Sequence, residues 1–293
     1  MRWLVTGAGG MLGRDMTDVL DRRGERVAGL DRGALDITRY DAVADAIAAH
    51  RPDVVVNCAA CTAVDDAETD EDRALRVNGD GPRHLARACA AAGARLVHVS
   101  TDYVFPGDAT TPYPEDHPPA PRTAYGRTKL AGERAVLEEL PDTGVIVRTA
   151  WLYGVHGRSF VRTMMDLEAR SATVDVVDDQ RGQPTWSADV AARVADLGPL
   201  VGRGASGVLH ATSSGETTWY DLAREVFHGL GADPDRIHPV GSAACPRPAP
   251  RPAYSVLAHG RWRELGLPPL RDWRAALHEA LPHIRKESLR ETP

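Results

Sequence analysis

The chain has 293 residues, of which 43% are hydrophobic, so it can bury a large core without disulfides or metal ions to hold it together. Its 41 acidic residues outnumber its 35 basic ones, and the formal net charge of −6 excludes a generally basic surface. Nucleic acid and anionic membranes are therefore not expected as main partners.

The first residues, MRWLVTGAGG, enter an apolar strand and a glycine loop without the charged region, long apolar run and cleavage site of a secretory signal. No stretch approaches the roughly 18 apolar residues of a membrane helix. We therefore expect a cytoplasmic protein.

The four cysteines are too few and too scattered for a disulfide framework. Cys58 and Cys61 form a C-x-x-C pair, which indicates either a redox or zinc site or simply two small residues at a strand end. No second pair follows at zinc-like spacing, so we favour the structural interpretation.

Short β-branched runs alternate with amphipathic stretches along the first 170 residues. The expected strands are 2–7, 26–31, 53–60, 95–101 and 144–151, and the expected helices are 11–22, 41–50, 70–92, 124–140 and 159–170. This order predicts an α/β fold with a doubly wound parallel sheet, helices on both faces and ligands beyond the carboxyl ends of the strands.

The pattern becomes less regular after residue 150, with strands expected at 174–177 and 207–212, a helix after Pro184 and a last helix near 272–283. We predict a Rossmann-like domain over 1–150, to which 186–214 return, and a smaller C-terminal substrate-binding lobe made of 151–185 and 215–290. The tail 285–293, RKESLRETP, is expected to fray.

A proline-rich stretch, CPRPAPRPAY, spans 245–254. Such a stretch is typical of a rigid loop or linker, but it could equally line the site. The sequence leaves both interpretations open.

The first expected strand runs into GAGGMLG, which places Gly7, Gly10 and Gly13 at a strand-to-helix turn. Glycines there let the backbone turn tightly and approach a pyrophosphate at the positive N-terminus of the next helix. The stretch predicts a dinucleotide cofactor.

The end of the second expected strand carries two signals of opposite meaning. Asp31 can accept hydrogen bonds from the adenosine ribose and favours NADH, whereas Arg32 can pair with a 2′-phosphate and favours NADPH. Asp36 and Ile37 follow, and either lie near the adenine or, as Asp36 or Thr38, cap the next helix.

The stretch LVHVSTD is an apolar strand that ends in hydroxyl groups at the edge where ligands bind. Thr101 or Ser100 could therefore hydrogen-bond a substrate oxygen. Serine and threonine at strand ends also serve as turn formers and caps, so this stretch alone does not decide between the two.

Tyr125 and Lys129 lie four residues apart on an expected helix and share one of its faces. Only two of the 35 basic residues are lysines, so Lys129 stands out. A nearby ammonium lowers the pKa of a tyrosine, which predicts that Tyr125 is a general acid helped by Lys129.

Thr101, Tyr125 and Lys129, following GAGGMLG, resemble the Ser/Thr-Tyr-Lys triad of the extended short-chain dehydrogenase/reductases. The chain also resembles the dTDP-4-dehydrorhamnose reductase family over nearly its whole length. The motifs that carry this resemblance are RPDVVVNCAACTAVDDAE, STDYVFPG, YGRTKLAGE, RTAWLYG, DDQRGQPT, TTWYDLA and PAPRPAYSVL.

The resemblance implies hydride transfer from NADPH or NADH to the C4 ketone of a dTDP-6-deoxy-4-ketohexose, most simply dTDP-4-dehydro-L-rhamnose. It implies that Tyr125 gives the proton, that Lys129 holds the nicotinamide ribose, and that Thr101 hydrogen-bonds the reacting oxygen. The cofactor positions it implies are Gly7, Gly10, Met11, Leu12, Asp31, Asp36, Ile37, Ala59, Ala60, Thr62, Tyr125 and Lys129. The implied substrate contacts are Val64, Thr101, Tyr103 and Trp151; the last two could equally be core aromatics.

The chain departs from the family pattern at Cys61, where an aromatic or other bulky residue is usual, which predicts a wider pocket edge near the nicotinamide. Asp15 matches one position of a magnesium site seen in some members, but the remaining ligands are not matched, so Mg²⁺ is possible and no metal is assigned. A monomer or a homodimer is expected.

Two alternatives accompany this interpretation. One is the same chemistry on a related sugar for a secondary metabolite, as in the dihydrostreptose synthases or other antibiotic deoxysugar reductases. The other is a non-catalytic dinucleotide-binding protein like the regulatory subunit of methionine adenosyltransferase.

Overall fold

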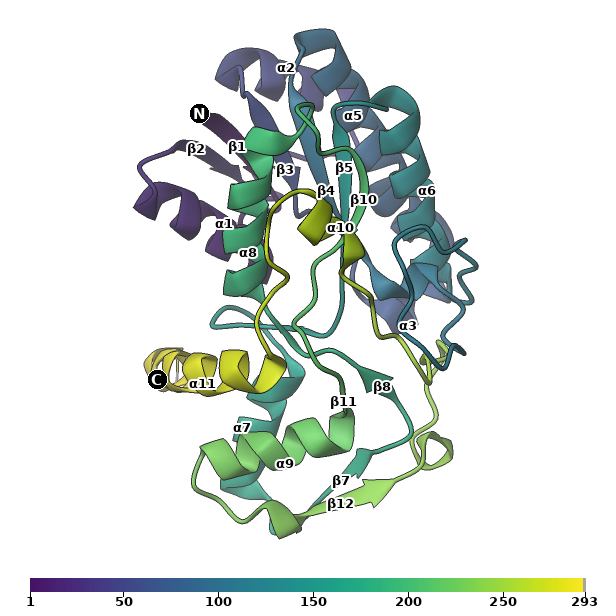
Figure 1. Ribbon diagram of the computed structural model, residues 1–293, viewed down its shortest axis with the longest axis vertical. Helices are drawn as coiled ribbons and strands as arrows, with labels where there is room; N and C mark the ends of the chain where they lie inside the picture. The colour runs from purple at the N-terminus through teal and green to yellow at the C-terminus, as the bar shows by residue number, and fades with distance from the viewer. Residues whose placement is uncertain (292–293) are drawn as a thin grey trace.

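The computed structural model describes residues 1–291, with side chains through residue 288. Six parallel strands form its central sheet in the order β2-β1-β3-β4-β5-β10 (Figure 1). Strands β3 and β5 are buried at every position, which is why both are nearly continuous apolar runs in the sequence. The strands are β1 Arg2–Thr6, β2 Arg26–Leu30, β3 Val54–Asn57, β4 Arg95–Thr101, β5 Gly144–Thr149 and β10 Gly207–His210.

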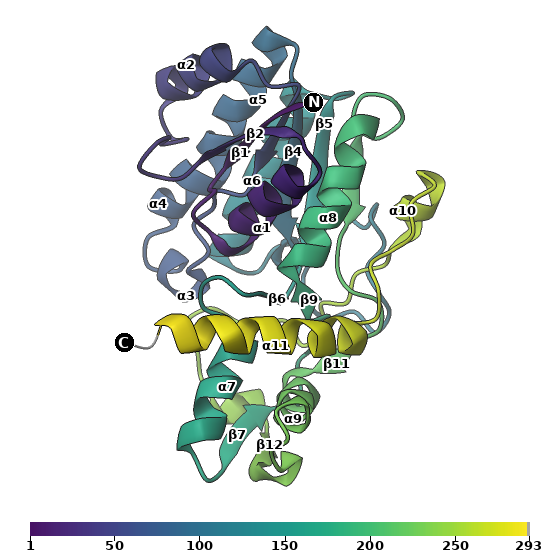
Figure 2. The same cartoon turned by 90° about the vertical axis from the view of Figure 1, so that its left-hand side faces the viewer.

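Helices cover both faces of this sheet, as Figures 1 and 2 show. On one face α1, Met11–Arg22, packs against α8, Ser187–Leu197. On the other face α5, Gly81–Ala92, lies between α2, Tyr40–His50, and α6, Ala124–Glu139. The predicted doubly wound α/β fold is confirmed. The chain passes from β1 to β2 on one side and to β3 on the other, so the carboxyl ends of β1 and β3 form a switch point at which ligands bind.

A second group of elements lies beyond the carboxyl ends of the central strands (Figure 1). It has its own apolar core, built largely from three helices, and contains three two-stranded sheets. The helices are α7 Phe160–Arg170, α9 Trp219–Gly229 and α11 Trp273–Glu291. The strand pairs are β6 Leu152–Tyr153 with β9 Thr185–Trp186, β7 Val174–Val177 with β12 Ile237–Val240, and β8 Arg181–Gly182 with β11 Thr217–Thr218.

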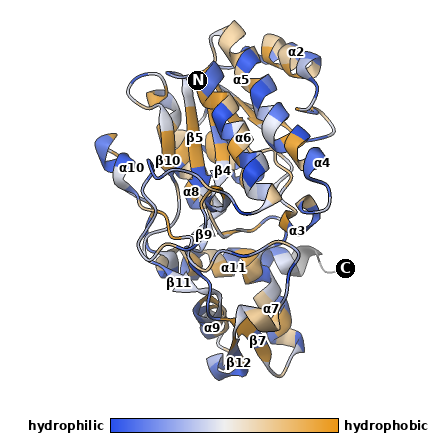
Figure 3. Ribbon diagram, turned by 90° about the vertical axis from the view of Figure 1, so that its right-hand side faces the viewer, coloured by the Kyte–Doolittle hydropathy of each residue, from blue (hydrophilic) through white to orange (hydrophobic). Residues whose placement is uncertain are grey.

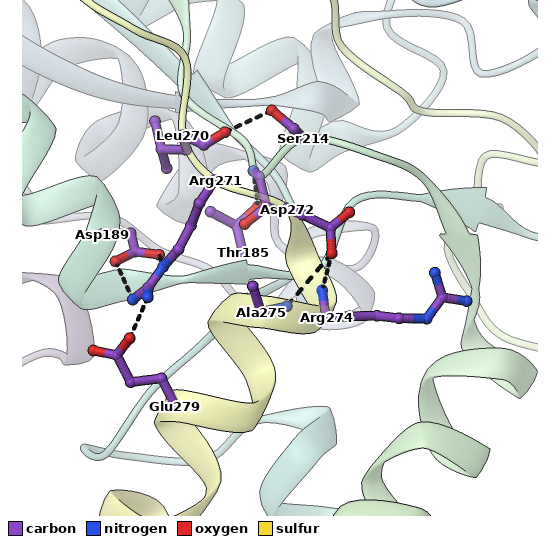
Figure 4. Close-up of polar contacts among 10 residues, drawn as sticks. Thr185, Asp189, Ser214, Leu270, Arg271, Asp272, Arg274, Ala275 and Glu279 are labelled. Carbon is purple, nitrogen blue, oxygen red and sulfur yellow. Dashed lines mark hydrogen bonds and ion pairs between the residues drawn. The ribbon is translucent and has the colours of Figure 1, made fainter.

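The start of α11 is tied to α8 through Arg271 (Figure 4). The Arg271 guanidinium donates to both carboxylate oxygens of Asp189 at 2.8 and 2.9 Å and also pairs with Glu279. Asp272 accepts hydrogen bonds from the backbone N–H groups of Arg274 and Ala275, which fixes the first turn of α11. These contacts hold the smaller lobe against the helix layer of the central sheet.

Two segments differ from the sequence-based expectation. The helix expected over 70–92 consists of α4, Glu71–Leu75, a π-helical segment, Arg76–Asp80, and then α5; a short helix α3, Val64–Ala67, precedes it. The expectation that the tail from 285 frays is wrong for 285–291, because α11 continues to Glu291 after burying Leu281 and Ile284 in the small-lobe core. The last two tail residues, 292–293, lie outside the described residues.

The hydropathy of the ribbon matches this layering. Figure 3 shows apolar residues along the strands of the central sheet, next to helix α6, which mixes apolar and polar residues. A further short helix, α10, Gly260–Glu264, buries Trp262. Within residues 1–291, no helix combines the length and the hydropathy needed to cross a bilayer.

Candidate active site

A cleft of about 1060 Å³ opens between the carboxyl ends of the central strands and the smaller lobe. Its wall includes the start of α1, the segments that follow β3, β4 and β5, and parts of α6 and α7. Eleven predicted site residues line it: Gly10, Met11, Leu12, Ala60, Thr62, Val64, Thr101, Tyr103, Tyr125, Lys129 and Trp151. Residues far apart in sequence thus meet at the edge of the sheet where the fold places ligands.

The glycine loop leaves no room for a side chain at Gly7 or at Gly13. A Cβ atom on Gly7, whose φ is +67°, would lie 2.6 Å from the Ala59 nitrogen, and one on Gly13 would lie 2.2 Å from the Gly7 oxygen. Gly10 is the N-cap residue of α1, and among the described residues no side chain caps that helix, so its first N–H groups can receive an anion. The loop therefore fits a pyrophosphate.

The predicted adenosine contacts lie outside the cleft wall. Asp31 is exposed beside Gly9, where a Cβ atom would lie 3.3 Å from the Asp31 Cβ, and its Oδ1 accepts from the Gly33 and Ala34 N–H groups at 2.9 and 3.0 Å. Arg32 is exposed next to it, and Ile37 is buried in the core. Ala59 packs against the glycine loop.

The alternative that Asp36 or Thr38 caps the next helix is wrong. Helix α2 begins at Tyr40, after Arg39. Asp36 Oδ1 instead accepts from the Thr38 N–H at 3.0 Å and from the Thr38 hydroxyl at 2.8 Å, so it closes a local turn. These hydrogen bonds hold the pKa of Asp36 below its usual value.

Helix α6 begins so that Tyr125 lies beside the end of β4. Thr123 caps the helix by accepting from the Gly126 N–H at 3.0 Å. A Cβ atom on Gly126 would lie 2.2 Å from the Tyr103 oxygen, so glycine at this position lets the helix approach the turn after Thr101. Tyr125 and Lys129 follow on one face of α6, and both side chains reach the cleft.

Burial raises the pKa of Tyr125 above its ordinary value, while the Thr101 hydroxyl acts in the opposite direction. The prediction that Lys129 lowers this pKa differs from the structure. Lys129 Nζ is turned toward strand β4, where it donates to the Val99 oxygen at 2.7 Å and lies 3.4 Å from His98 Nε2. Tyr125 therefore holds its proton at neutral pH, which suits a proton donor.

Lys129 is 2% exposed. Burial lowers the pKa of its ammonium to about 8, and Glu133, one turn further along α6, acts in the opposite direction. Lys129 can therefore change its charge close to physiological pH.

Asp102 is a cleft residue that the sequence-based reasoning did not single out, although it lies in the STDYVFPG motif. Burial raises its pKa to about 6, and its Oδ1 accepts from the Thr101 hydroxyl at 2.9 Å. Because Thr101 has a single hydroxyl proton, donating to a substrate oxygen requires Thr101 to release Asp102.

An aromatic wall closes the small-lobe side of the cleft. Trp151 has a φ of +48°, and its ring stacks on Trp219 at 3.5 Å between centroids. Gly182 makes room for it, since a Cβ atom there would lie 2.5 Å from the Trp151 ring. Tyr103 meets Tyr125 edge to face at 5.5 Å. Of the two interpretations of Trp151 and Tyr103, the structure supports the cleft position.

The proline-rich stretch also forms part of the wall, through Cys245, Arg247, Arg251 and Pro252. Arg251 is fixed by Asp65, whose two carboxylate oxygens accept from it at 2.9 and 2.8 Å. Arg158 adds another guanidinium to the lining. The sequence signal for Arg247 and Arg251 was their position within CPRPAPRPAY, which composition alone does not distinguish from a linker.

The loop after β3 is held by the π-helical segment. Asn78 accepts from the Cys61 N–H at 2.8 Å and donates to the Cys61 oxygen at 3.0 Å and to Thr128 Oγ1 at 3.2 Å. The Cys61 side chain packs against the apolar cluster that contains Tyr125 and is not among the residues that line the cleft, and the widening of the pocket edge at residue 61 stays a prediction.

The remaining predictions on cysteines and metal concern the periphery of the cleft. All four cysteines are free, and burial raises the pKa of the Cys58 thiol to about 12, which does not suit a redox thiolate. The ligand atoms of Asp15, Asp18 and His156 lie within 4.8 Å of one another, but Asp15 already accepts from the Ser187 hydroxyl, and burial raises its pKa.

Comparison with known proteins gives a family over almost the whole chain. The model described as "RmlD substrate binding domain" matches residues 1–286. A "dTDP-4-dehydrorhamnose reductase" of Streptomyces griseus is 61% identical over 294 residues, covering 100% of this chain and 97% of that protein. A "Probable dTDP-4,6-dihydroxy-2-methyloxan-3-one 4-ketoreductase" of Streptomyces antibioticus is 61% identical over 285 residues, covering 97% of this chain and 96% of that protein.

Solved structures agree with this assignment. The crystal structure of dTDP-4-dehydrorhamnose reductase from Bacillus anthracis in complex with NADP has a TM-score of 0.91 and 36% sequence identity. The match covers 96% of this chain and 98% of that one. The central sheet and the smaller lobe are thus shared with a protein whose structure contains a nicotinamide cofactor.

Proposed function

The chain belongs to the RmlD substrate binding domain family, and on that premise we propose that it reduces the C4 ketone of a dTDP-6-deoxy-4-ketohexose with NAD(P)H. The observation that carries the proposal is the meeting of Thr101, Tyr125 and Lys129 in one cleft with the glycine loop. The alternative of a non-catalytic binding protein is dropped, because the triad is intact and the relatives are reductases.

The roles proposed for Tyr125 and Thr101 follow from their surroundings, and the role proposed for Lys129 follows from the family that the chain resembles. The reduced nicotinamide supplies the hydride when it is bound. Tyr125 gives its proton to the oxygen of the reacting carbonyl, a step for which its buried, protonated phenol is suited. Thr101 and the neighbouring Asp102 place a hydroxyl and a carboxyl group beside that oxygen. Lys129 holds the nicotinamide ribose.

The smaller lobe is proposed to bind the sugar nucleotide. Trp151, Tyr103 and Val64 offer an apolar surface to the face of a deoxysugar that carries a methyl group instead of a hydroxyl. Arg158, Arg247 and Arg251 supply positive charge to the same cleft, which suits a diphosphate. Arg251 also pairs with Asp65, which offsets part of its charge.

We propose dTDP-4-dehydro-L-rhamnose as the substrate and dTDP-L-rhamnose as the product. The second candidate is a related dTDP-4-keto sugar of antibiotic biosynthesis, such as the precursor of dihydrostreptose. It is favoured by the second Streptomyces relative, which is 61% identical, as the first is.

Product identity tests this proposal. The purified enzyme, supplied with dTDP-4-dehydro-L-rhamnose and NADPH or NADH, should consume the cofactor and yield dTDP-L-rhamnose, identified by NMR of the isolated product. A different product would favour the second candidate. So would the absence of turnover with this substrate if another dTDP-4-keto sugar is reduced. Turnover of no dTDP-keto sugar would contradict both.

Cofactor preference should depend on Asp31 and Arg32. We propose that the enzyme accepts both cofactors, with Asp31 bonding the ribose hydroxyls of NADH and Arg32 pairing with the phosphate of NADPH. Asp31→Asn keeps an oxygen for the turn to Gly33 and Ala34 but removes the charge. We expect kcat/KM for NADPH relative to NADH to rise by about 10-fold, the scale of one hydrogen bond to a charged group.

Arg32→Ala is the matched variant, and it should move the same ratio in the opposite direction. Both ratios come from initial rates at varied concentrations of each cofactor. An unchanged ratio in both variants would remove these two residues from cofactor selection.

A cytoplasmic location is part of the proposal, because NAD(P)H and nucleotide sugars are cytoplasmic metabolites. A monomer or a homodimer is proposed for the assembly. Sedimentation of the purified protein with and without cofactor distinguishes the two.

A further inference from the structure

A chain of buried polar side chains runs under the cleft to Lys129. The Thr6 hydroxyl donates to Asn57 Oδ1 at 2.7 Å, Asn57 Nδ2 lies 2.9 Å from His98 Nδ1, and His98 Nε2 lies 3.4 Å from Lys129 Nζ. The parallel register produces this row, because it pairs Thr6 with Asn57 and Asn57 with His98. All four residues are at most 2% exposed.

The hydrogen-bond partners fix which nitrogen of His98 carries the proton. The Ala59 N–H lies 3.1 Å from Asn57 Oδ1 and can only donate, so Oδ1 is the oxygen of that amide. Asn57 therefore turns its NH₂ group toward His98, and His98 Nδ1 must accept. A neutral imidazole that accepts at Nδ1 has its hydrogen on Nε2.

This tautomer directs an N–H group at Lys129. An ammonium group has three donors and no acceptor, so its charged form meets the His98 N–H donor to donor, and the 3.4 Å separation is long for a hydrogen bond. A neutral amine has a lone pair and can accept from His98 while its own hydrogen goes to the Val99 oxygen. The geometry thus favours the neutral form of Lys129.

The other groups around Lys129 either oppose the neutral form or do not affect it. Glu133, on the same helix, raises the pKa of Lys129, and Cys58 does so only as a thiolate, which its own raised pKa excludes near neutrality. His98 cannot add a positive charge, because burial holds its pKa well below the usual value. Burial and the His98 donor therefore act together against Glu133.

We propose that His98 is a positioning residue for the reductase: with its hydrogen fixed on Nε2 by Asn57, it keeps Lys129 against strand β4 and favours the uncharged amine. The inference rests on the proposed function, because the role of Lys129 in holding the nicotinamide ribose is part of that function. A ribose hydroxyl that accepts from Lys129 would favour the ammonium form, so cofactor binding is linked to uptake of a proton by this side chain.

The composition allows a direct test. Since Lys129 and Lys286 are the only lysines, protein labelled with ¹³C at lysine Cε gives two signals, and Lys286→Arg leaves one. We expect the Lys129 signal to titrate near pH 8 without cofactor and higher with NADP⁺ bound. In the same protein, ¹⁵N spectra should show His98 protonated at Nε2. Titration of Lys129 at an ordinary lysine value, or a proton on His98 Nδ1, overturns the proposal.

Asn57→Asp tests the coupling with an almost isosteric change. The new carboxylate still accepts from Thr6 and Ala59 but now also accepts from His98, which moves the His98 proton to Nδ1 and leaves Nε2 to accept from the ammonium. We expect the Lys129 midpoint to rise by at least about one pH unit. A switched tautomer with an unchanged midpoint contradicts the coupling.

His98→Phe in the Asn57→Asp background is the control. It keeps the added negative charge and removes the imidazole, so the part of the shift that disappears belongs to the His98 tautomer. If the whole shift survives, charge alone explains it and His98 has no positioning role. These measurements need no turnover. They can therefore contradict the role of His98 while the reductase activity is present, and they can support that role even if no activity is found.

Discussion

Tyr125→Phe should lower kcat by at least about 100-fold, the usual scale of general acid catalysis, while cofactor affinity stays close to that of the native enzyme. The change removes one oxygen and keeps the ring that meets Tyr103 edge to face. The Tyr125 phenol carries its proton at neutral pH, so its loss leaves the alkoxide without its donor. Oxidation of NADPH measures kcat, and quenching of protein fluorescence measures cofactor binding.

Tyr113→Phe is the matched control for loss of a buried tyrosine hydroxyl. The Tyr113 hydroxyl accepts from the backbone N–H groups of Gly107, Asp108 and Ala109 at 3.0 to 3.1 Å, away from the cleft. Its removal should reduce thermal stability and leave kcat near the native value. If Tyr125→Phe behaved like Tyr113→Phe, Tyr125 would have no part in the proton transfer.

Arg148→Met should destabilise the fold by about 3–5 kcal/mol, because it leaves a buried carboxylate without its partner. Arg148 on β5 donates to both oxygens of Glu133 on α6 at 2.9 and 2.6 Å, and the two side chains are 3% and 2% exposed. The Arg148 guanidinium also lies 4.9 Å from the centre of the Phe105 ring. The free energy of unfolding from urea denaturation measures the effect.

The double variant Arg148→Met with Glu133→Leu removes both charges and should recover most of the lost stability. Equal stability of the single and double variants at neutral pH would contradict the importance of this pair.

The fold could be predicted because its signals are local. Apolar runs ending in glycine or in hydroxyl residues mark β1, β4 and β5, and helical periodicity marks α1 and α6. The π-helical segment, Arg76–Asp80, could not be predicted in this way, because it depends on Asn78 bonding a loop and a helix that are distant in sequence. The length of α11 likewise depends on burial of Leu281 and Ile284 by other parts of the chain.

In the active site, too, local spacing predicts some features, and contacts between distant segments determine the others. Tyr125 and Lys129 are one helical turn apart, so their spacing predicts that they meet at one site. The orientation of Lys129 depends instead on His98 and Val99, which belong to a strand whose packing against α6 no local pattern reveals. For this reason the sequence identified Lys129 as a site residue but led to the prediction that it lowers the pKa of Tyr125, which the structure does not show.

The position of β10 has a consequence for how the protein is made. A nascent chain that has emerged as far as residue 150 contains five of the six central strands, but β5 still has a free edge until Gly207 pairs with Val145. The face of α1 that packs on α8 is also uncovered at that stage. Truncation at the end of β5 would therefore yield an aggregation-prone sheet, and the central sheet can be completed only after residues 151–206 have also left the ribosome.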